Sequence, residues 1–139
     1  MSFCENRRLA GSRIRILIAD DHDVVRAGMR ALLEAESDFE VCGEARDGRE
    51  ALKEACRLAP DVVILDFSMP GMNGLEVTRR IRALSGELAS VPIIGVSGHT
   101  ALSDERAARA AGMDAFLAKP VSPGALTEAI AKATQPRSR

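Results

Sequence analysis

Tryptophan and tyrosine are absent from this sequence, and its aromatic side chains are four phenylalanines. Proteins that bind single-stranded nucleic acid stack the bases on aromatic side chains, so little of that chemistry is available here. A formal net charge of −1 also provides no basic surface that would attract nucleic acid or an anionic membrane. We therefore expect this chain by itself to bind neither nucleic acid nor membranes.

Paired cysteine spacings and long apolar runs are lacking as well. The three cysteines, Cys4, Cys42 and Cys56, are not spaced as in a zinc site or a disulfide framework. Their odd number fits a reducing compartment, where a buried cysteine packs as a small hydrophobic residue. The first residues have no apolar segment typical of a signal peptide, and no apolar run approaches the length of a membrane-spanning helix. We expect a cytoplasmic protein.

What the chain does contain fits one globular domain. Its 139 residues are 46% hydrophobic and 28% charged, which allows a substantial core and excludes wholesale disorder. No internal repeat or low-complexity segment interrupts residues 13–134. We expect a polar N-terminal tail over residues 1–12, a single domain over 13–134, and a C-terminal tail or the start of a linker over 135–139.

Five short apolar runs alternate with five amphipathic segments along this domain. The apolar runs predict strands over residues 14–19, 39–45, 62–65, 91–97 and 114–118. The segments that follow them predict helices over residues 24–36, 47–60, 73–84, 104–112 and 122–134. Such alternation predicts a mostly parallel sheet with helices on both faces, and right-handed crossovers then bring the carboxyl ends of all strands to one edge.

Residues typical of helix ends support these boundaries. The expected N-caps are Asp47, Asn73, Ser103 and Ser122, and the expected stop of the fourth helix is Gly112. Glu50 and Glu76 lie three residues after the first two caps and complete a capping box in each case. Pro123 occupies the first turn of the last helix, where its missing N–H group costs nothing.

Polar side chains stand where the predicted strands end. Asp20 and Asp21 leave the first strand, Asp66 the third, Ser97 the fourth and Lys119 the fifth. Taken singly, each has an ordinary alternative, because aspartate and serine cap helices and turns and lysine is usually a solvated surface charge. Open α/β sheets bind their ligands at the carboxyl ends of the strands. We therefore expect these five side chains to form one site.

Three carboxylates at one edge need a cation. Two of them about 4 Å apart repel by roughly 4 kcal/mol at an effective dielectric constant of 20. Mg²⁺ relieves this repulsion, since it binds through one or two carboxylates together with water and phosphate oxygens. Lys119 can neutralise one phosphoryl oxygen and Ser97 can donate a hydrogen bond to another. Asp66 is then the candidate nucleophile that forms an aspartyl phosphate.

Four stretches of the sequence carry a family resemblance. They are ILIADDH, VVILDFSMPGMNGLE, IIGVSGH and AFLAKPV. They resemble the signature stretches of the bacterial response-regulator receiver domain of two-component systems, and ADDHDVVRAGMRALL is similar to the subgroup that usually carries a C-terminal helix-turn-helix. The resemblance covers about residues 13–134. It implies a flavodoxin-like (βα)5 fold, a doubly wound five-stranded parallel sheet of order 2-1-3-4-5.

The resemblance also implies a role for each site residue. A sensor histidine kinase or a histidine phosphotransfer protein would phosphorylate Asp66. The implied ligands of Mg²⁺ are Asp21, Asp66 and the backbone carbonyl of Ser68, with Asp20 acting largely through water. The implied contacts of the phosphoryl oxygens are Ser97 and Lys119. The Lys119–Pro120 peptide bond would be cis, which is accessible before proline.

Phe116 lies three residues before the lysine, where the family has its aromatic switch. The alternative is a phenylalanine that only packs in the core. In the switch, Ser97 moves toward the phosphoryl group, Phe116 rotates inward, and the surface of the fourth helix, fifth strand and fifth helix changes shape. A phosphorylation-dependent homodimer through this surface is expected. Ser68 and His99 would flank the route of water to the aspartyl phosphate and tune its lifetime.

Two other functions fit parts of the sequence less well. Residues 21–25, DHDVV, formally fit the nucleophile motif of haloacid-dehalogenase-type phosphatases, but no acidic pair follows Lys119 and the chain is short for a cap domain. A pseudo-receiver that only makes protein contacts would not need all five site residues. A receiver is not an enzyme, although it promotes its own phosphorylation and dephosphorylation. The chain is either a stand-alone adaptor or the receiver half of a regulator that binds DNA through an output domain outside it.

Overall fold

The computed structural model of the chain describes residues 13–98 and 102–135. Its strands are β1 (Ile14–Ala19), β2 (Phe39–Ala45), β3 (Val62–Asp66), β4 (Ile93–Ser97) and β5 (Ala115–Ala118). Its helices are α2 (Asp23–Glu34), α3 (Gly48–Leu58), α4 (Gly74–Arg82), α5 (Leu102–Ala111), α6 (Pro123–Ala133) and the 3₁₀-helix η2 (Glu87–Ser90). The sequence predicted all of these elements except η2. None of the described helices combines the length and the apolar character needed to cross a membrane.

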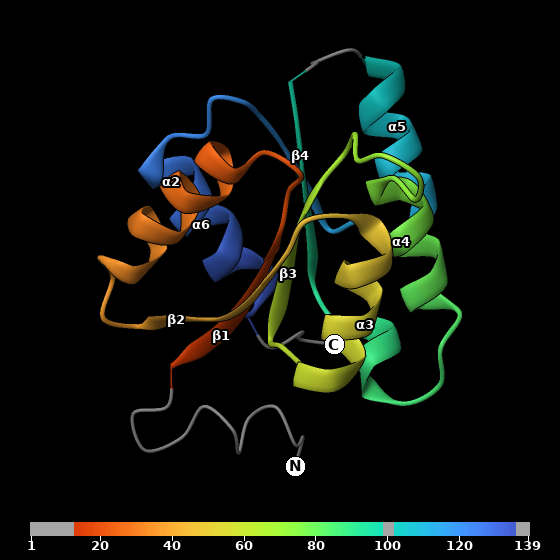
Figure 1. Cartoon of the computed structure of the whole chain (residues 1–139), viewed down its shortest axis with the longest axis horizontal. Coiled ribbons are helices and arrows are strands. Elements are labelled where there is room, and N and C mark those ends of the chain that lie inside the picture. The colour runs from red at the N-terminus through yellow and green to blue at the C-terminus, as the bar shows by residue number, and fades with distance from the viewer. Residues whose placement is uncertain (1–12, 99–101, 136–139) are drawn as a thin grey trace.

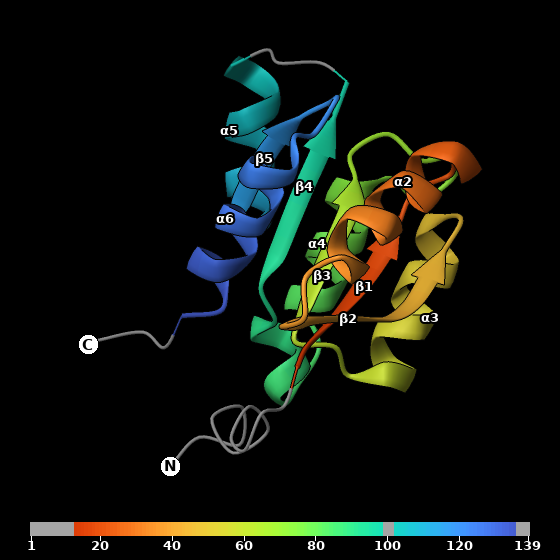
Figure 2. The same ribbon diagram turned by 90° about the vertical axis from the view of Figure 1, so that its left-hand side faces the viewer.

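The strands form one parallel sheet in the order β2-β1-β3-β4-β5. This is the order that the family resemblance implied, so the predicted flavodoxin-like fold is confirmed. All strands point the same way, and Figure 2 shows their carboxyl ends along a single edge of the sheet. The residues that follow β1, β3, β4 and β5 therefore meet at that edge.

Helices cover the sheet on both faces, with α2 and α6 on one and α3, α4 and α5 on the other (Figure 1). Successive residues of β1 alternate between the two cores. Ile16 and Ile18 are buried with side chains of α2 and α6, whereas Leu17 and Ala19 are buried with those of α3, α4 and α5. Burying a side chain of the size of leucine stabilises a fold by about 1.5–3 kcal/mol. Burial on both faces explains why the strands are continuous apolar runs.

Three of the four predicted helix caps are confirmed. The side chain of Asp47 accepts a hydrogen bond from the Glu50 backbone N–H at 2.8 Å, and that of Asn73 accepts one from Glu76 at 2.9 Å. The hydroxyl of Ser122 accepts a hydrogen bond from the Ala125 N–H at 3.1 Å. These caps satisfy N–H groups that have no partner inside the helix.

The predicted cap of the fourth helix is wrong by two residues. Helix α5 begins at Leu102, so Ser103 lies within its first turn instead of before it. A serine is readily accommodated there, because the first-turn N–H groups are free of intrahelical bonds and the residue alone does not mark the boundary. The predicted stop is confirmed, since Gly112 follows α5 with a φ of 111°. The Lys119–Pro120 peptide bond is cis, as the family resemblance implied.

Two glycines allow the loop between β3 and α4 to pack tightly. A Cβ atom added to Gly48, the first residue of α3, would lie 1.9 Å from the carbonyl oxygen of Met72. A Cβ atom added to Gly74 would lie 2.5 Å from the carbonyl oxygen of Asp66. Both obstacles are backbone atoms, so neither can rotate away. The loop that follows Asp66 is therefore held directly against the start of α3.

Replacing Gly48 with Ala should lower the free energy of unfolding by roughly 1–3 kcal/mol, because the added methyl group forces the backbone of the loop away from α3. Urea denaturation monitored by circular dichroism would measure the change. Gly28→Ala is the matched control, since a Cβ atom there meets nothing within 4 Å and should stabilise helix α2 by about 0.5–1 kcal/mol. A Gly48→Ala chain as stable as the unmodified chain would contradict the close packing.

Candidate functional site

The acids predicted to leave β1 and β3 lie side by side. Ala19 pairs with Leu65 in the parallel register of these strands, so the next residues, Asp20 and Asp66, are neighbours. Asp20 is fully buried and Asp66 is 3% exposed. Ligand atoms of Asp20, Asp21, His22 and Asp66 all lie within 4.8 Å of one another. The prediction that these three carboxylates converge is confirmed.

Lys119 joins the carboxylates from the end of β5. Its ammonium nitrogen lies 3.0 Å from Oδ2 of Asp20 and 3.2 Å from Oδ1 of Asp66. Only 20% of its side chain is exposed, so it is not the solvated surface charge of the ordinary alternative. One cation thus contacts the two most deeply buried carboxylates of the site.

Ser97 ends β4 between these groups and is 2% exposed. Strand pairing sets Val96 beside Asp66 and sets Ser97 beside Ala118, the residue before Lys119. The backbone N–H of Lys119 donates to the carbonyl oxygen of Ser97 at 2.7 Å. Ser97, which carries the predicted hydroxyl group, therefore ends the strand that lies between those of Asp66 and Lys119.

Burial and neighbouring charge make Asp66 a weaker acid than usual. Loss of solvent around its carboxyl group raises the pKa most, the negative charge of Asp20 raises it further, and Lys119 opposes both. The result is a pKa for Asp66 raised to about 6. Burial by itself lowers the pKa of Lys119, but its contacts with Asp20 and Asp66 outweigh burial and raise it. Asp66 therefore loses its proton at a higher pH than an ordinary aspartate does, and its carboxylate is paired with the Lys119 ammonium.

The acids after β1 do not cap helix α2, which was the ordinary alternative for them. The N-cap residue of α2 is His22, and no side chain provides the cap hydrogen bond. Instead, Oδ1 of Asp20 accepts a hydrogen bond from the His22 backbone N–H at 2.8 Å. Oδ2 of Asp20 and Oδ1 of Asp21 are both buried, and Oδ1 of Asp21 lies 3.2 Å from Nδ1 of His22. The cation nearest to Asp20 Oδ2 is Lys119, in an ion pair.

Three clustered carboxylates with one lysine beside them fit a hard divalent cation. Mg²⁺ takes oxygen ligands and commonly binds through one or two carboxylates with water and phosphate in its remaining positions. Asp20, Asp21 and Asp66 supply such oxygens within a few ångströms of one another. The donor set therefore fits the predicted Mg²⁺, and Lys119 would compensate the negative charge that one divalent ion leaves.

Phe116 contacts the residue that follows Asp66. Its ring meets the ring of Phe67 edge to face, with centroids 5.4 Å apart and an interplanar angle of 72°. It is partly buried against the core of α3, α4 and α5, and it lines a hollow of about 670 Å³ between α5, β5 and α6. Ser68, the predicted source of a carbonyl ligand, is exposed in the loop after β3. His99 lies outside the described residues.

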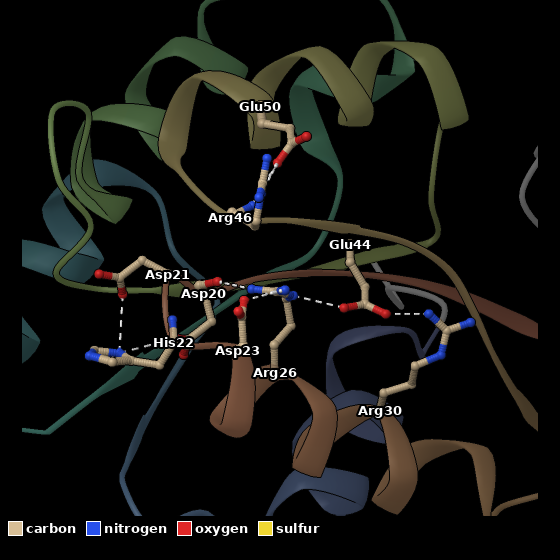
Figure 3. Close-up of polar contacts among 9 residues, drawn as sticks. All are labelled: Asp20, Asp21, His22, Asp23, Arg26, Arg30, Glu44, Arg46 and Glu50. Atoms are coloured by element: carbon tan, nitrogen blue, oxygen red, sulfur yellow. Dashed lines mark hydrogen bonds and ion pairs between the residues drawn. The ribbon is translucent and has the colours of Figure 1, made fainter.

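The sequence did not predict three residues that contact the acids or support them. The Nδ1 atom of His22 lies 3.2 Å from Oδ1 of Asp21, although the His22 side chain is 66% exposed. Arg26 donates a hydrogen bond to the carbonyl oxygen of Asp20 at 2.8 Å and another to Glu44 at 2.7 Å (Figure 3). Helix α2 and strand β2 each contain further charged residues, so nothing in the sequence distinguished Arg26 or Glu44.

Metal-free stability should fall as the pH rises through the pKa of Asp66. That pKa is about 6 in the folded chain and near 3.8 when unfolded, so the folded state binds more protons between these values. Asp66→Asn removes this effect and should raise the free energy of unfolding in EDTA by about 3 kcal/mol at pH 8 and by almost nothing at pH 4. Urea denaturation across this pH range would measure the difference. An equal gain at both pH values would contradict the raised pKa.

Comparison with known proteins places this chain among signalling proteins. The family model described as "Response regulator receiver domain" matches residues 16–131. The response regulator UvrY of Escherichia coli is 40% identical over 117 residues, which are 84% of this chain and 52% of UvrY. The transcriptional regulatory protein LiaR of Bacillus subtilis is 52% identical over 68 residues, which are 49% of this chain and 32% of LiaR. The chain spans about half the length, or less, of the curated relatives it matches.

Solved structures agree with this result. A DNA-binding response regulator of the LuxR family from Staphylococcus aureus superimposes with a TM-score of 0.80 at 33% identity. The alignment covers 88% of this chain and 99% of that one. The similarity therefore extends across the fold and the edge of the sheet where the site lies.

Proposed function

This chain belongs to the response regulator receiver domain family, and on that premise we propose that it accepts a phosphoryl group on Asp66 from a histidine kinase or a histidine phosphotransfer protein. The observation that carries the proposal is the position of Asp66, which is buried beside the acid pair of β1 and lies 3.2 Å from the Lys119 ammonium. The haloacid-dehalogenase alternative has no support, because both the family match and the sheet order are those of a receiver.

In the proposed transfer, a carboxylate oxygen of Asp66 attacks the phosphorus atom of a phosphohistidine. A P–O bond to Asp66 forms while the P–N bond breaks, and the histidine of the donor leaves with the electron pair. Lys119 neutralises negative charge on the phosphoryl oxygens, and Ser97 donates a hydrogen bond to one of them. Mg²⁺, when bound by Asp21, Asp66 and the Ser68 carbonyl with Asp20 acting through water, would supply further positive charge to those oxygens.

The product is an aspartyl phosphate that water later hydrolyses, so each chain stores one phosphoryl group for a limited time. Ser68 and His99 lie two positions after Asp66 and Ser97, respectively, and are our candidates for tuning that time. Because the chain itself promotes both steps and is itself modified, we infer a phosphoacceptor and not an enzyme that turns over a separate substrate. We place the exchange in the cytoplasm, the reducing compartment that the odd cysteine count favours.

The signal would leave through the surface of α5, β5 and α6. Ser97 and Phe116 connect the site to that surface, since Ser97 lies at the site and Phe116 lines the hollow between those three elements. We propose that phosphorylation shifts the chain between two conformations of this surface and promotes a homodimer there. In a longer protein, an output domain after this one would bind DNA. A stand-alone chain would offer the surface to another protein.

One measurement separates a receiver from a phosphatase. Incubation with Mg²⁺ and acetyl phosphate should label the chain to at most one phosphoryl group, and EDTA should prevent labelling. Intact-mass spectrometry gives the stoichiometry, and an assay of inorganic phosphate gives the turnover. Rapid, continuous hydrolysis without an accumulated phosphoprotein would contradict the proposal. Labelling that is equally fast in EDTA would show that the phosphoryl transfer does not need a metal ion.

A further inference from the structure

Behind the acid pair, α2 and β2 are joined by an ionic network that the proposed function does not use (Figure 3). Arg26 and Arg30 of α2 both bond to the carboxylate of Glu44 in β2. We propose that Arg26, oriented by Glu44, is a positioning residue that fixes the backbone of the acid pair for metal binding. This inference rests on the proposed function, because it concerns the same Mg²⁺ site.

Arg26 holds the peptide group between Asp20 and Asp21. Its Nη1 donates to the carbonyl oxygen of Asp20 at 2.8 Å. That carbonyl and the N–H of Asp21 belong to one planar peptide group, so fixing the carbonyl also fixes the direction in which the chain continues to Asp21. The Asp20 N–H is held in turn by the carbonyl oxygen of Ala45 at 3.0 Å. The backbone of Asp20 is therefore restrained on both sides.

The Arg26 side chain is itself held in one orientation. Its Nε donates to Oε1 of Glu44 at 2.7 Å and its Nη2 donates to Oδ1 of Asp23 at 2.7 Å. A guanidinium group is planar, so three acceptors on three of its nitrogens determine its plane. The side chain of Arg26 is only 12% exposed, which limits competition from water. Hydrogen bonds from Arg30 and Arg26 outweigh burial and lower the pKa of Glu44, which keeps this acceptor ionised at neutral pH.

Arg26 could affect metal binding through its position or through its charge. Taken as charge alone, Arg26 repels Mg²⁺, so its removal would tighten metal binding. Taken as a positioning group, its removal frees the peptide between Asp20 and Asp21 and weakens binding. Residues that orient the ligands of a metal typically account for 10–100-fold in affinity. The two explanations therefore predict changes of opposite sign for one substitution.

Titration of the metal-free chain with Mg²⁺ alone, followed by isothermal calorimetry, is the test. We expect Arg26→Met to raise the dissociation constant of Mg²⁺ about 10–100-fold. Arg26→Lys should not restore affinity, because an ammonium group cannot provide the planar set of donors. A dissociation constant that is unchanged or lower in Arg26→Met would overturn the inference.

Two controls separate positioning from general stability. Arg30 is the other partner of Glu44; its side chain is 41% exposed, and its bonds are to Glu34 and Glu44 and not to Asp20. Arg30→Met should therefore change Mg²⁺ affinity less than about twofold. Arg82 holds the opposite edge of the sheet through hydrogen bonds to Ala89, Val91 and Gly112. Arg82→Met should destabilise the fold yet leave Mg²⁺ affinity unchanged, and a loss equal to that of Arg26→Met would overturn the inference.

A further variant tests the inference if the Arg26→Met chain does not fold. Glu44→Ala removes the group that orients Arg26 and should weaken Mg²⁺ binding at least about threefold, whereas wild-type affinity in a folded Glu44→Ala chain would overturn the inference. The Mg²⁺ affinity of the unmodified chain distinguishes a failure of the proposed function from a failure of this inference. If the unmodified chain binds no Mg²⁺, the proposed function and this inference both fall. If it binds Mg²⁺ and the Arg26 variants bind equally well, only this inference falls.

Discussion

Replacing Asp66 with Asn should abolish labelling by acetyl phosphate, a loss of more than about 1,000-fold in rate, because an amide is not a nucleophile at neutral pH. Asp66 is the carboxylate that lies 3% exposed beside the Lys119 cation, and Asp20 is fully buried. The fold should survive, since asparagine has nearly the same size and removes a destabilising charge. Mass spectrometry of proteolytic peptides after labelling with Mg²⁺ and acetyl phosphate would locate any phosphoryl group that remains.

Asp38→Asn is the matched control for this loss. Asp38 is exposed and lies just before β2, at the edge of the sheet opposite the site. That variant should be labelled at the rate of the unmodified chain, on the peptide that contains Asp66. Full labelling of an Asp66→Asn chain would assign the nucleophile to another residue, with Asp20 and Asp21 as the nearest candidates.

Replacing Lys119 with Ala should leave Mg²⁺ binding intact but disconnect phosphorylation from the surface of α5, β5 and α6. The ammonium lies 3.0 Å from Asp20 and 3.2 Å from Asp66, so its loss removes a cation that competes with Mg²⁺ for those carboxylates. We therefore expect Mg²⁺ to bind at least as tightly as in the unmodified chain. The phosphoryl group, however, would lose the contact that links it to the end of β5.

Hydrogen exchange would test this separation. In the unmodified chain, beryllofluoride with Mg²⁺, which mimics the phosphoryl group, should change the exchange rates of β5 and its flanking helices several-fold. In Lys119→Ala the change should be less than about twofold, whereas Lys53→Ala, an exposed lysine on α3, should respond as the unmodified chain does. A normal response in Lys119→Ala would show that the lysine is not the connection.

The predictions that succeeded from sequence depend on backbone rules. Alternation of apolar runs and amphipathic segments fixes a parallel sheet, and a parallel sheet places the ends of its strands together whatever the side chains are. Asp20, Asp66 and Lys119 could be grouped for that reason before any distance was known. Their convergence follows from their positions at strand ends, which can be read directly along the chain.

The residues that were missed depend on side-chain direction. Arg26 and Glu44 are 18 positions apart in sequence, and charge pattern alone does not say that one spans from α2 to the other in β2. The contact of Gly48 with Met72 was missed for a similar reason, since it exists only once α3 and the loop after β3 have been packed together. Ser103 failed as a cap because the first turn of a helix tolerates the same small polar residues that precede it.

The edge-to-face contact of Phe67 and Phe116 has a consequence for the unstimulated chain. Phe67 follows Asp66, the proposed phosphoacceptor, and Phe116 belongs to β5, which is part of the proposed output surface. Protein interiors are close-packed, so the volume available to one ring is limited by the other. On the proposed switch, the resting level of output before any kinase acts would be set in part by the size of residue 67. Relatives with a smaller side chain at that position would start from a higher background and leave their kinase a narrower range to control.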